Sequence, residues 1–180
     1  MESIKLFILT TLFFLSSIIS FAQKKIEQNK VNNVGSKIGF WSEMHNGQKT
    51  ECYYKNGKLE GVIKTYYKNG ELFYLGFYKN DTLTGNAYWF NEDGQIIVLE
   101  ENISVNNFYV MNANNNKIKP LYKSNYKTYF ENGSIESEGI LLYEDSPLFE
   151  SIECGKWIYY YEYGGVKSIV DYKDRVLIDR

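Results

Sequence analysis

The chain has 180 residues, with 17 Tyr, 11 Phe and 3 Trp but only 2 Pro, 2 Cys and 1 His. Its 20 basic and 22 acidic residues give a net charge of −2, so we expect neither nucleic-acid nor lipid binding. One histidine and two cysteines exclude a multi-histidine metal site, a disulfide-rich scaffold and a cysteine-based zinc finger. We expect no metal and no cofactor.

The first 22 residues have the pattern of a secretory signal peptide. Lys5 precedes an almost wholly apolar stretch at 6–19, and Ser20-Phe21-Ala22 forms a small-x-small cleavage site. The alternative is an uncleaved anchor, but the stretch is short for a membrane span. No cysteine stands at the cleavage site. We therefore expect an exported protein, periplasmic or extracellular, that is not a lipoprotein and keeps no transmembrane span after cleavage.

Residues 23–36 are polar and indicate a flexible lead-in, and residues 37–180 form a tandem repeat. Turn-forming dipeptides recur at nearly constant intervals, since Asn46 and Asn69 are 23 residues apart and Asp93 follows 24 residues later. Such dipeptides supply the positive φ angles of two-residue hairpin turns. This first series of turns comprises Asn46-Gly47, Asn69-Gly70, Asp93-Gly94, Asn132-Gly133 and Gly164-Gly165.

A second series of turns interleaves with the first. Residues 53–57 (Tyr-Tyr-Lys-Asn-Gly) match residues 77–81 (Phe-Tyr-Lys-Asn-Asp), 24 positions later, and residues 171–175 are a weaker copy. The runs between turns are rich in Tyr, Phe, Trp, Ile and Val, which favour strands. The sequence predicts an all-β fold, an open antiparallel meander of stacked β-hairpins with about 23–24 residues per unit.

Alternation along the strands predicts two different faces. One face is nearly all apolar or aromatic and carries Trp41, Ile63, Ala87, Trp89, Tyr126, Phe130, Trp157, Tyr159 and Tyr161. The other mixes polar residues with Tyr66, Phe90, Tyr129 and Tyr160 near the turns. We expect the first face to form the core. The sheet edges at both ends of the array are expected to be open for pairing with another chain.

Two stretches interrupt the period. An irregular Asn-rich insertion near 102–123 is expected to be a long loop or one degenerate unit. A shorter surplus centres on residues 145–150.

The repeat resembles the MORN repeat, and most closely the variant of the bacterial YwqK-family antitoxin proteins. The segments that carry the resemblance are Gly39-Phe40-Trp41, residues 54–61, residues 78–85 and Gly155-Lys156-Trp157-Ile158-Tyr159-Tyr160. The resemblance covers about 35–99 and 122–178 and implies an open or curved sheet of hairpins without catalytic residues. It further implies a protein that binds partners.

No constellation of reactive side chains is visible, so we expect a protein that is not an enzyme. His45 stands at a turn and has no oriented partner in the sequence. Cys52 and Cys154 lie near opposite ends of the array, too far apart for a disulfide, and are expected to be free thiols. The carboxylate pairs Glu92-Asp93 and Glu144-Asp145 lack the spacing of a calcium loop and are expected to be solvated turns.

The aromatic rows are the feature most suited to binding. Our candidate for a partner-binding aromatic strip is Tyr66, Phe90, Tyr129 and Tyr160. The function predicted is that of an exported, non-enzymatic protein-binding or envelope-scaffolding module whose partner is a protein or an envelope component. The alternative is an antitoxin or immunity protein that neutralises a partner toxin.

Overall fold

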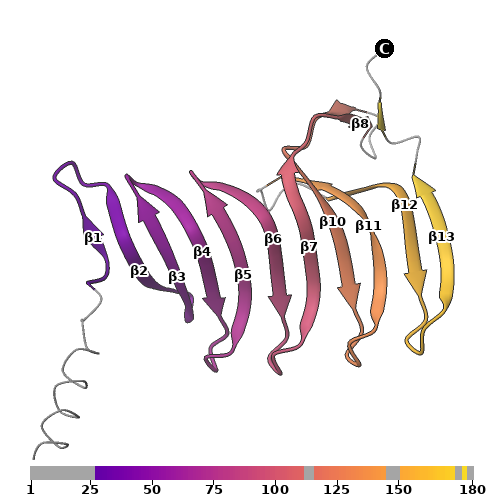
Figure 1. The fold of residues 1–180 in the computed structure, drawn as a ribbon, viewed down its shortest axis with the longest axis horizontal. Helices are drawn as coiled ribbons and strands as arrows, with labels where there is room; N and C mark the ends of the chain where they lie inside the picture. Colours follow the sequence, from indigo (N-terminus) through magenta and orange to yellow (C-terminus); the bar gives the residue numbers. More distant parts are fainter. Residues whose placement is uncertain (1–26, 112–115, 145–150, 173–175, 178–180) are drawn as a thin grey trace, which may run out of the picture.

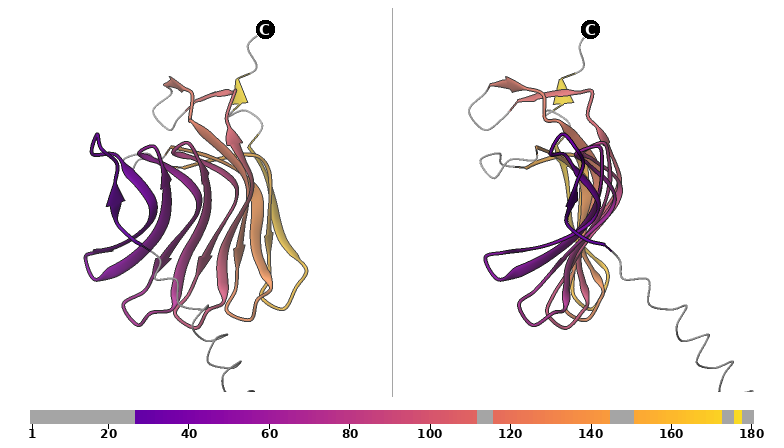
Figure 2. Two further views of the ribbon diagram at one scale, coloured as in Figure 1. Left: turned by 60° about the vertical axis from the view of Figure 1, so that its left-hand side comes forward. Right: turned by 90° about the vertical axis from the view of Figure 1, so that its left-hand side faces the viewer.

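The structure is a computed structural model that describes residues 27–111, 116–144, 151–172 and 176–177. The predicted signal peptide at 1–22 lies outside the described residues. Eleven strands form one open antiparallel sheet, in the order β1-β2-β3-β4-β5-β6-β7-β10-β11-β12-β13. The sheet is curved along its length (Figures 1 and 2). The predicted all-β meander of hairpins is therefore confirmed.

The strands of the large sheet are β1 (Lys30–Val31), β2 (Lys37–His45), β3 (Gln48–Lys55), β4 (Lys58–Tyr66), β5 (Leu72–Lys79), β6 (Thr82–Phe90), β7 (Ile96–Val105), β10 (Tyr122–Tyr129), β11 (Ile135–Tyr143), β12 (Ile152–Tyr160) and β13 (Val166–Tyr172). A second sheet of three strands has the order β14-β8-β9. Its members are β8 (Tyr109–Met111), β9 (Lys117–Ile118) and β14 (Val176–Leu177).

The turns are of two kinds, and only one kind was predicted. Asn46-Gly47, Asn56-Gly57 and Asn80-Asp81 have positive φ at both residues, as a two-residue turn requires. After β4 the loop is longer: Tyr67 N donates to Glu71 O, and of the pair Asn69-Gly70 only Gly70 has a positive φ. The loops after β6, β10 and β12 repeat this arrangement. Asn69 acts through its side chain, which accepts a hydrogen bond from Glu71 N.

One face of the large sheet, here called the tryptophan face, carries Trp41, Trp89 and Trp157. Cross-strand pairing aligns its central residues into a row that runs Ile63, Gly76, Ala87, Glu100, Tyr126 and Gly139. Trp157 packs over Gly139 and leaves no room for a Cβ there. Leu83, Ala87, Ile103 and Tyr122 form a buried cluster on this face. The predicted face therefore does form a core, but Tyr161, which was expected to belong to it, is 42% exposed.

The other face of the large sheet, here called the opposite face, has a core cluster of its own. Leu142, Ile152 and Cys154 are buried together with Val110 of β8, and Ile118 of β9 packs against them. The second sheet stands at the edge of the large sheet where β7 and β10 end and begin (Figure 1). The insertion at 102–123 therefore folds into short strands that cover part of the opposite face, and is not simply a loop.

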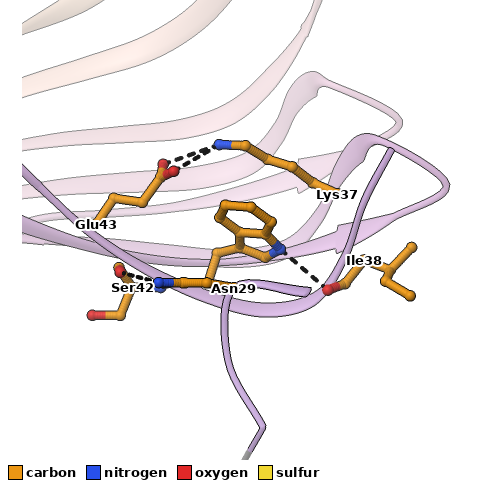
Figure 3. A network of polar contacts seen from close by, with 6 residues as sticks. Asn29, Lys37, Ile38, Ser42 and Glu43 are labelled. Atoms are coloured by element: carbon orange, nitrogen blue, oxygen red, sulfur yellow. Dashed lines mark hydrogen bonds and ion pairs between the residues drawn. The ribbon is translucent and has the colours of Figure 1, made fainter. Parts of the chain in front are cut away.

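The first strand edge is partly closed. Residues 27–36, which belong to the expected lead-in, place β1 against β2. The Asn29 side chain continues this pairing, because its Nδ2 donates to Ser42 O at 3.1 Å and its Oδ1 accepts from Ser42 N at 2.8 Å (Figure 3). Asn29 thus occupies backbone groups of β2 that an open edge would leave exposed. The edge of β2 is therefore partly covered, and the two-residue β1 forms the open edge of the sheet at this end.

Candidate binding surface

The four residues of the predicted aromatic strip occupy equivalent positions, at the ends of β4, β6, β10 and β12. All four are only half-buried. Tyr66 OH donates to Glu51 Oε2 at 2.8 Å, and Tyr160 OH donates to Glu138 Oε1 at 2.6 Å. Both acceptors lie on the preceding strand of the sheet. The strip therefore exists as a regular row, but hydrogen bonds within the sheet occupy two of its hydroxyl groups.

The hydrogen bond between Tyr66 and Glu51 affects the pKa of the Tyr66 hydroxyl. Burial together with the hydrogen bond to the Glu51 carboxylate raises the pKa of Tyr66 to about 12. The pKa of Glu51 is lowered, chiefly because Lys49 binds it. The phenol is thus held neutral as a donor, which suits a structural role.

A more exposed apolar row crosses β3, β4 and β5 on the opposite face. It consists of Tyr53, Val62 and Phe77, which are 53, 38 and 39% exposed. Val62 pairs directly with Phe77, and Tyr53 pairs with the half-buried Phe40 of β2. We call these three residues the exposed row. They form contiguous apolar surface that no described part of the chain covers.

Lysines flank the exposed row. Lys55, Lys64 and Lys79 each lie two residues from a row member on the same strand, and so point to the same face. Lys58 pairs with Lys55 and adds a further positive charge. All four are exposed. Glu51 and Glu60 lie on the same face by the same spacing, opposite Lys64 and Lys79, and both are half-buried. The surface therefore combines an apolar centre with a mixed border in which exposed lysines predominate, although the chain as a whole is slightly acidic.

Sequence reasoning missed this row. The repeat pattern identifies Tyr53 and Phe77 only as members of equivalent segments, and it does not single out Val62. The available signal was that Tyr53 and Phe77 lie 24 residues apart in strands that end in exposed lysines.

The other candidate residues carry no visible site chemistry. Cys52 and Cys154 are both buried, and neither forms a disulfide, as predicted. Cys52 belongs to the tryptophan face beside Trp41, whereas Cys154 lies under β8 on the opposite face. Burial raises the pKa of the Cys52 thiol, which makes it less reactive. His45 ends β2 and is exposed, next to its turn.

Acidic residues do not gather into a metal site in the part of the chain that the structure describes. Glu92 and Asp93 are exposed in a loop, as is Glu144 at the end of β11, while Asp145 lies outside the described residues. Among the described residues, no helix is long and apolar enough to cross a membrane.

Comparison with protein families identifies the repeats. Residues 59–80, 122–141 and 153–174 match the MORN repeat variant. Each match spans one hairpin with the longer kind of loop, so one repeat corresponds to β4–β5, β10–β11 or β12–β13. No curated protein matches the chain. The chain thus contains MORN-type repeats, which generally serve as protein- or membrane-binding modules. The match does not confirm the resemblance to the YwqK-family antitoxin proteins.

Proposed function

We propose that the protein is an exported, non-enzymatic module that binds another protein through the exposed row. The observation that supports this most is the uncovered apolar surface of Tyr53, Val62 and Phe77 within a border in which exposed lysines predominate. Contiguous exposed apolar surface with a polar rim is typical of protein interaction sites. The signal-peptide pattern at 1–22 supports a partner in the cell envelope or outside the cell.

The chemistry of the row indicates what the partner presents. An apolar segment would fill the centre, and acidic side chains beside it would meet Lys55 and Lys58, because Lys64 and Lys79 already stand opposite Glu51 and Glu60. The second half of the molecule shows that a short β-sheet with an apolar face can pack on this side of the array, since Val110 and Ile118 do so there. We therefore expect a protein segment of this kind, apolar with acidic flanks.

Affinity capture tests the proposal. Residues 23–180 would be used to capture partners from an envelope extract of the source organism, with identification by mass spectrometry. The partner should no longer be captured by the triple variant Tyr53→Ser/Val62→Ser/Phe77→Ser. The matched control, Tyr66→Phe/Tyr160→Phe, alters the predicted strip conservatively and should retain it.

Three results would overturn the proposal: retention by the triple Ser variant, loss by the control alone, or binding only to anionic vesicles. The antitoxin alternative predicts in addition that co-expression rescues growth against the captured protein.

A further inference from the structure

The tryptophan face contains a pocket that no part of the proposed function uses. Its volume is about 370 Å³, within the range of small-ligand sites. The walls are aromatic: the rings of Tyr74 and Trp89 lie 4.9 Å apart, and those of Tyr122 and Tyr143 lie 5.5 Å apart. Tyr78 and Leu83 complete them, and Glu100 and Glu144 are the acidic lining residues.

Among the lining residues of the pocket, Glu100 is unusual because its carboxyl group is buried. It lies in the central row of the tryptophan face, between Ala87 and Tyr126, and is only 5% exposed. Its Oε2 makes no hydrogen bond within the described residues, and neither does the hydroxyl of Ser124 or of Tyr143. A buried carboxyl group without full hydrogen bonding destabilises a fold, so three such atoms together call for an explanation.

The hydroxyls of Ser124 and Tyr143 are close neighbours of Glu100. Both act on the carboxyl group in the direction that lowers its pKa, although neither reaches Oε2 with the geometry of a hydrogen bond. The polar atoms therefore form one group and not three separate defects.

The charges of the pocket indicate the ligand. Neither lysine nor arginine is among the lining residues, while Glu100 and Glu144 are both acidic. Aromatic ring faces attract organic cations, most strongly where water is excluded. A primary ammonium group has three N–H donors, and two lining residues, Glu100 and Tyr143, each carry an oxygen acceptor without a hydrogen-bond partner in the described residues.

We propose that this pocket binds the ammonium group of an aliphatic primary amine, with Glu100 as counter-ion, the hydroxyl of Tyr143 as acceptor, and the rings of Tyr74, Trp89 and Tyr122 as walls. The amine is either a free small molecule or the lysine side chain of a peptide. This site lies on the side of the sheet away from the exposed row, because Tyr78 and Phe77 are adjacent in β5 and point to opposite faces.

Protonation should be coupled to binding. Burial raises the pKa of Glu100, so the empty pocket favours the neutral acid, whereas an ammonium ion favours the carboxylate. The other titratable groups facing Glu100 are Tyr74 on β5, Tyr122 and Tyr126 on β10, Tyr143 on β11, and Glu144 beyond it. Affinity should therefore rise with pH as Glu100 ionises.

Titration of the full chain tests the inference. Trp89 fluorescence and calorimetry would follow n-butylammonium as the free-amine probe, and a short lysine-containing peptide with blocked termini as the peptide probe. 1-Butanol is the neutral control of the same shape. We expect saturable binding of n-butylammonium, tighter at pH 8 than at pH 5, and binding of 1-butanol at least about tenfold weaker. If the peptide binds more tightly than n-butylammonium, the natural ligand is a lysine side chain; otherwise it is a free amine.

Variants complete the test. Glu100→Gln should weaken n-butylammonium binding at least about tenfold and remove its pH dependence, and Tyr143→Phe should weaken it less. Glu101→Gln, which removes a carboxylate from the next residue of β7 on the opposite face, should leave it unchanged. Equal binding of 1-butanol, binding of neither probe, or unchanged binding by Glu100→Gln would overturn the inference. Because the exposed row is not touched, capture of the protein partner by Glu100→Gln tests the proposed function separately.

Discussion

The opposite face of the large sheet is covered by short strands in the second half of the array and is exposed in the first half. In the second half, Leu142 pairs with Ile152, and both are buried under the small sheet. In the first half, the last pair before the turn is Lys79 with Thr82, and no described segment covers it. The same repeat thus produces a covered apolar surface in one half and an exposed one with a lysine-rich border in the other. The repeat sequence sets the hairpins, and the insertion that carries β8 and β9 covers the apolar surface only in the second half.

The largest contrast should come from truncating one apolar side chain in each half. Leu142→Ala should lower the free energy of unfolding by about 2–5 kcal/mol, because Leu142 is fully buried. Phe77→Ala should lower it by less than about 1 kcal/mol, because Phe77 is 39% exposed. Urea unfolding measures both. Equal losses would show that the two halves are not covered differently.

A second contrast compares the two faces of β7 through pH. Burial raises the pKa of Glu100, so its ionisation destabilises the folded protein. Glu100→Gln should therefore match wild type at about pH 4, below the unfolded pKa of Glu, and become the more stable of the two as pH rises. The gain is about 1.4 kcal/mol for each unit by which folding raises that pKa. Denaturant midpoints from pH 4 to pH 8 measure it, with Glu101→Gln as control; identical profiles for the two variants would contradict the assignment.

Thiol labelling sharpens the contrast between covered and uncovered surface. Cys154 lies under the small sheet, whereas Cys52 lies on the tryptophan face in the first half. Val110→Ala removes apolar contact between β8 and the large sheet. If this lowers the free energy of opening the small sheet by about 1.4 kcal/mol, labelling of Cys154 should become about tenfold faster. The rate at Cys52 should not change. Peptide mapping after timed labelling gives both rates, and acceleration at both sites would indicate general loosening instead of local opening.

The smallest effect is expected within the predicted strip. Tyr66→Phe removes the hydrogen bond to Glu51 and should change the free energy of unfolding by less than about 1 kcal/mol, because the pair is solvent-accessible. It should also remove the tyrosine that titrates at about pH 12. Unfolding curves and ultraviolet pH titration measure these two effects. A loss above about 2 kcal/mol would show that the strip is part of the core.

Much of the fold could be predicted from the sequence, because local chemistry specifies it. Positive φ at Asn56-Gly57 follows from the residue types, and two-residue alternation places Trp41, Ala87 and Trp157 on one face. The loops after β4 and β6 could not be predicted in detail, because dipeptides such as Asn-Gly and Asp-Gly also occur in longer loops in which only the glycine has a positive φ.

The surfaces were harder to predict. The strands that cover the second half are two or three residues long and lie in an Asn-rich stretch, too short to show alternation. Glu100 follows a continuous apolar run, Ile96 to Leu99. Because this run does not alternate between apolar and polar residues, the sequence does not show on which face Glu100 lies. Pairing residues across the turn at Asp93-Gly94 would have placed Glu100 opposite the buried Ala87. Exposure of Tyr53 depends on the absence of a cover, which is a tertiary property.

Site-specific photo-cross-linking in the living source cell would show directly which surface of the protein contacts a partner. A benzophenone amino acid would replace Phe77 in the exposed row, Phe90 in the predicted strip, or Ser168 on the tryptophan face. If the exposed row is the binding surface, position 77 should give one discrete cross-linked protein and position 168 none, with at most a weak product from position 90. A discrete product from position 90 or 168 with none from position 77 would show that the exposed row is not the binding surface.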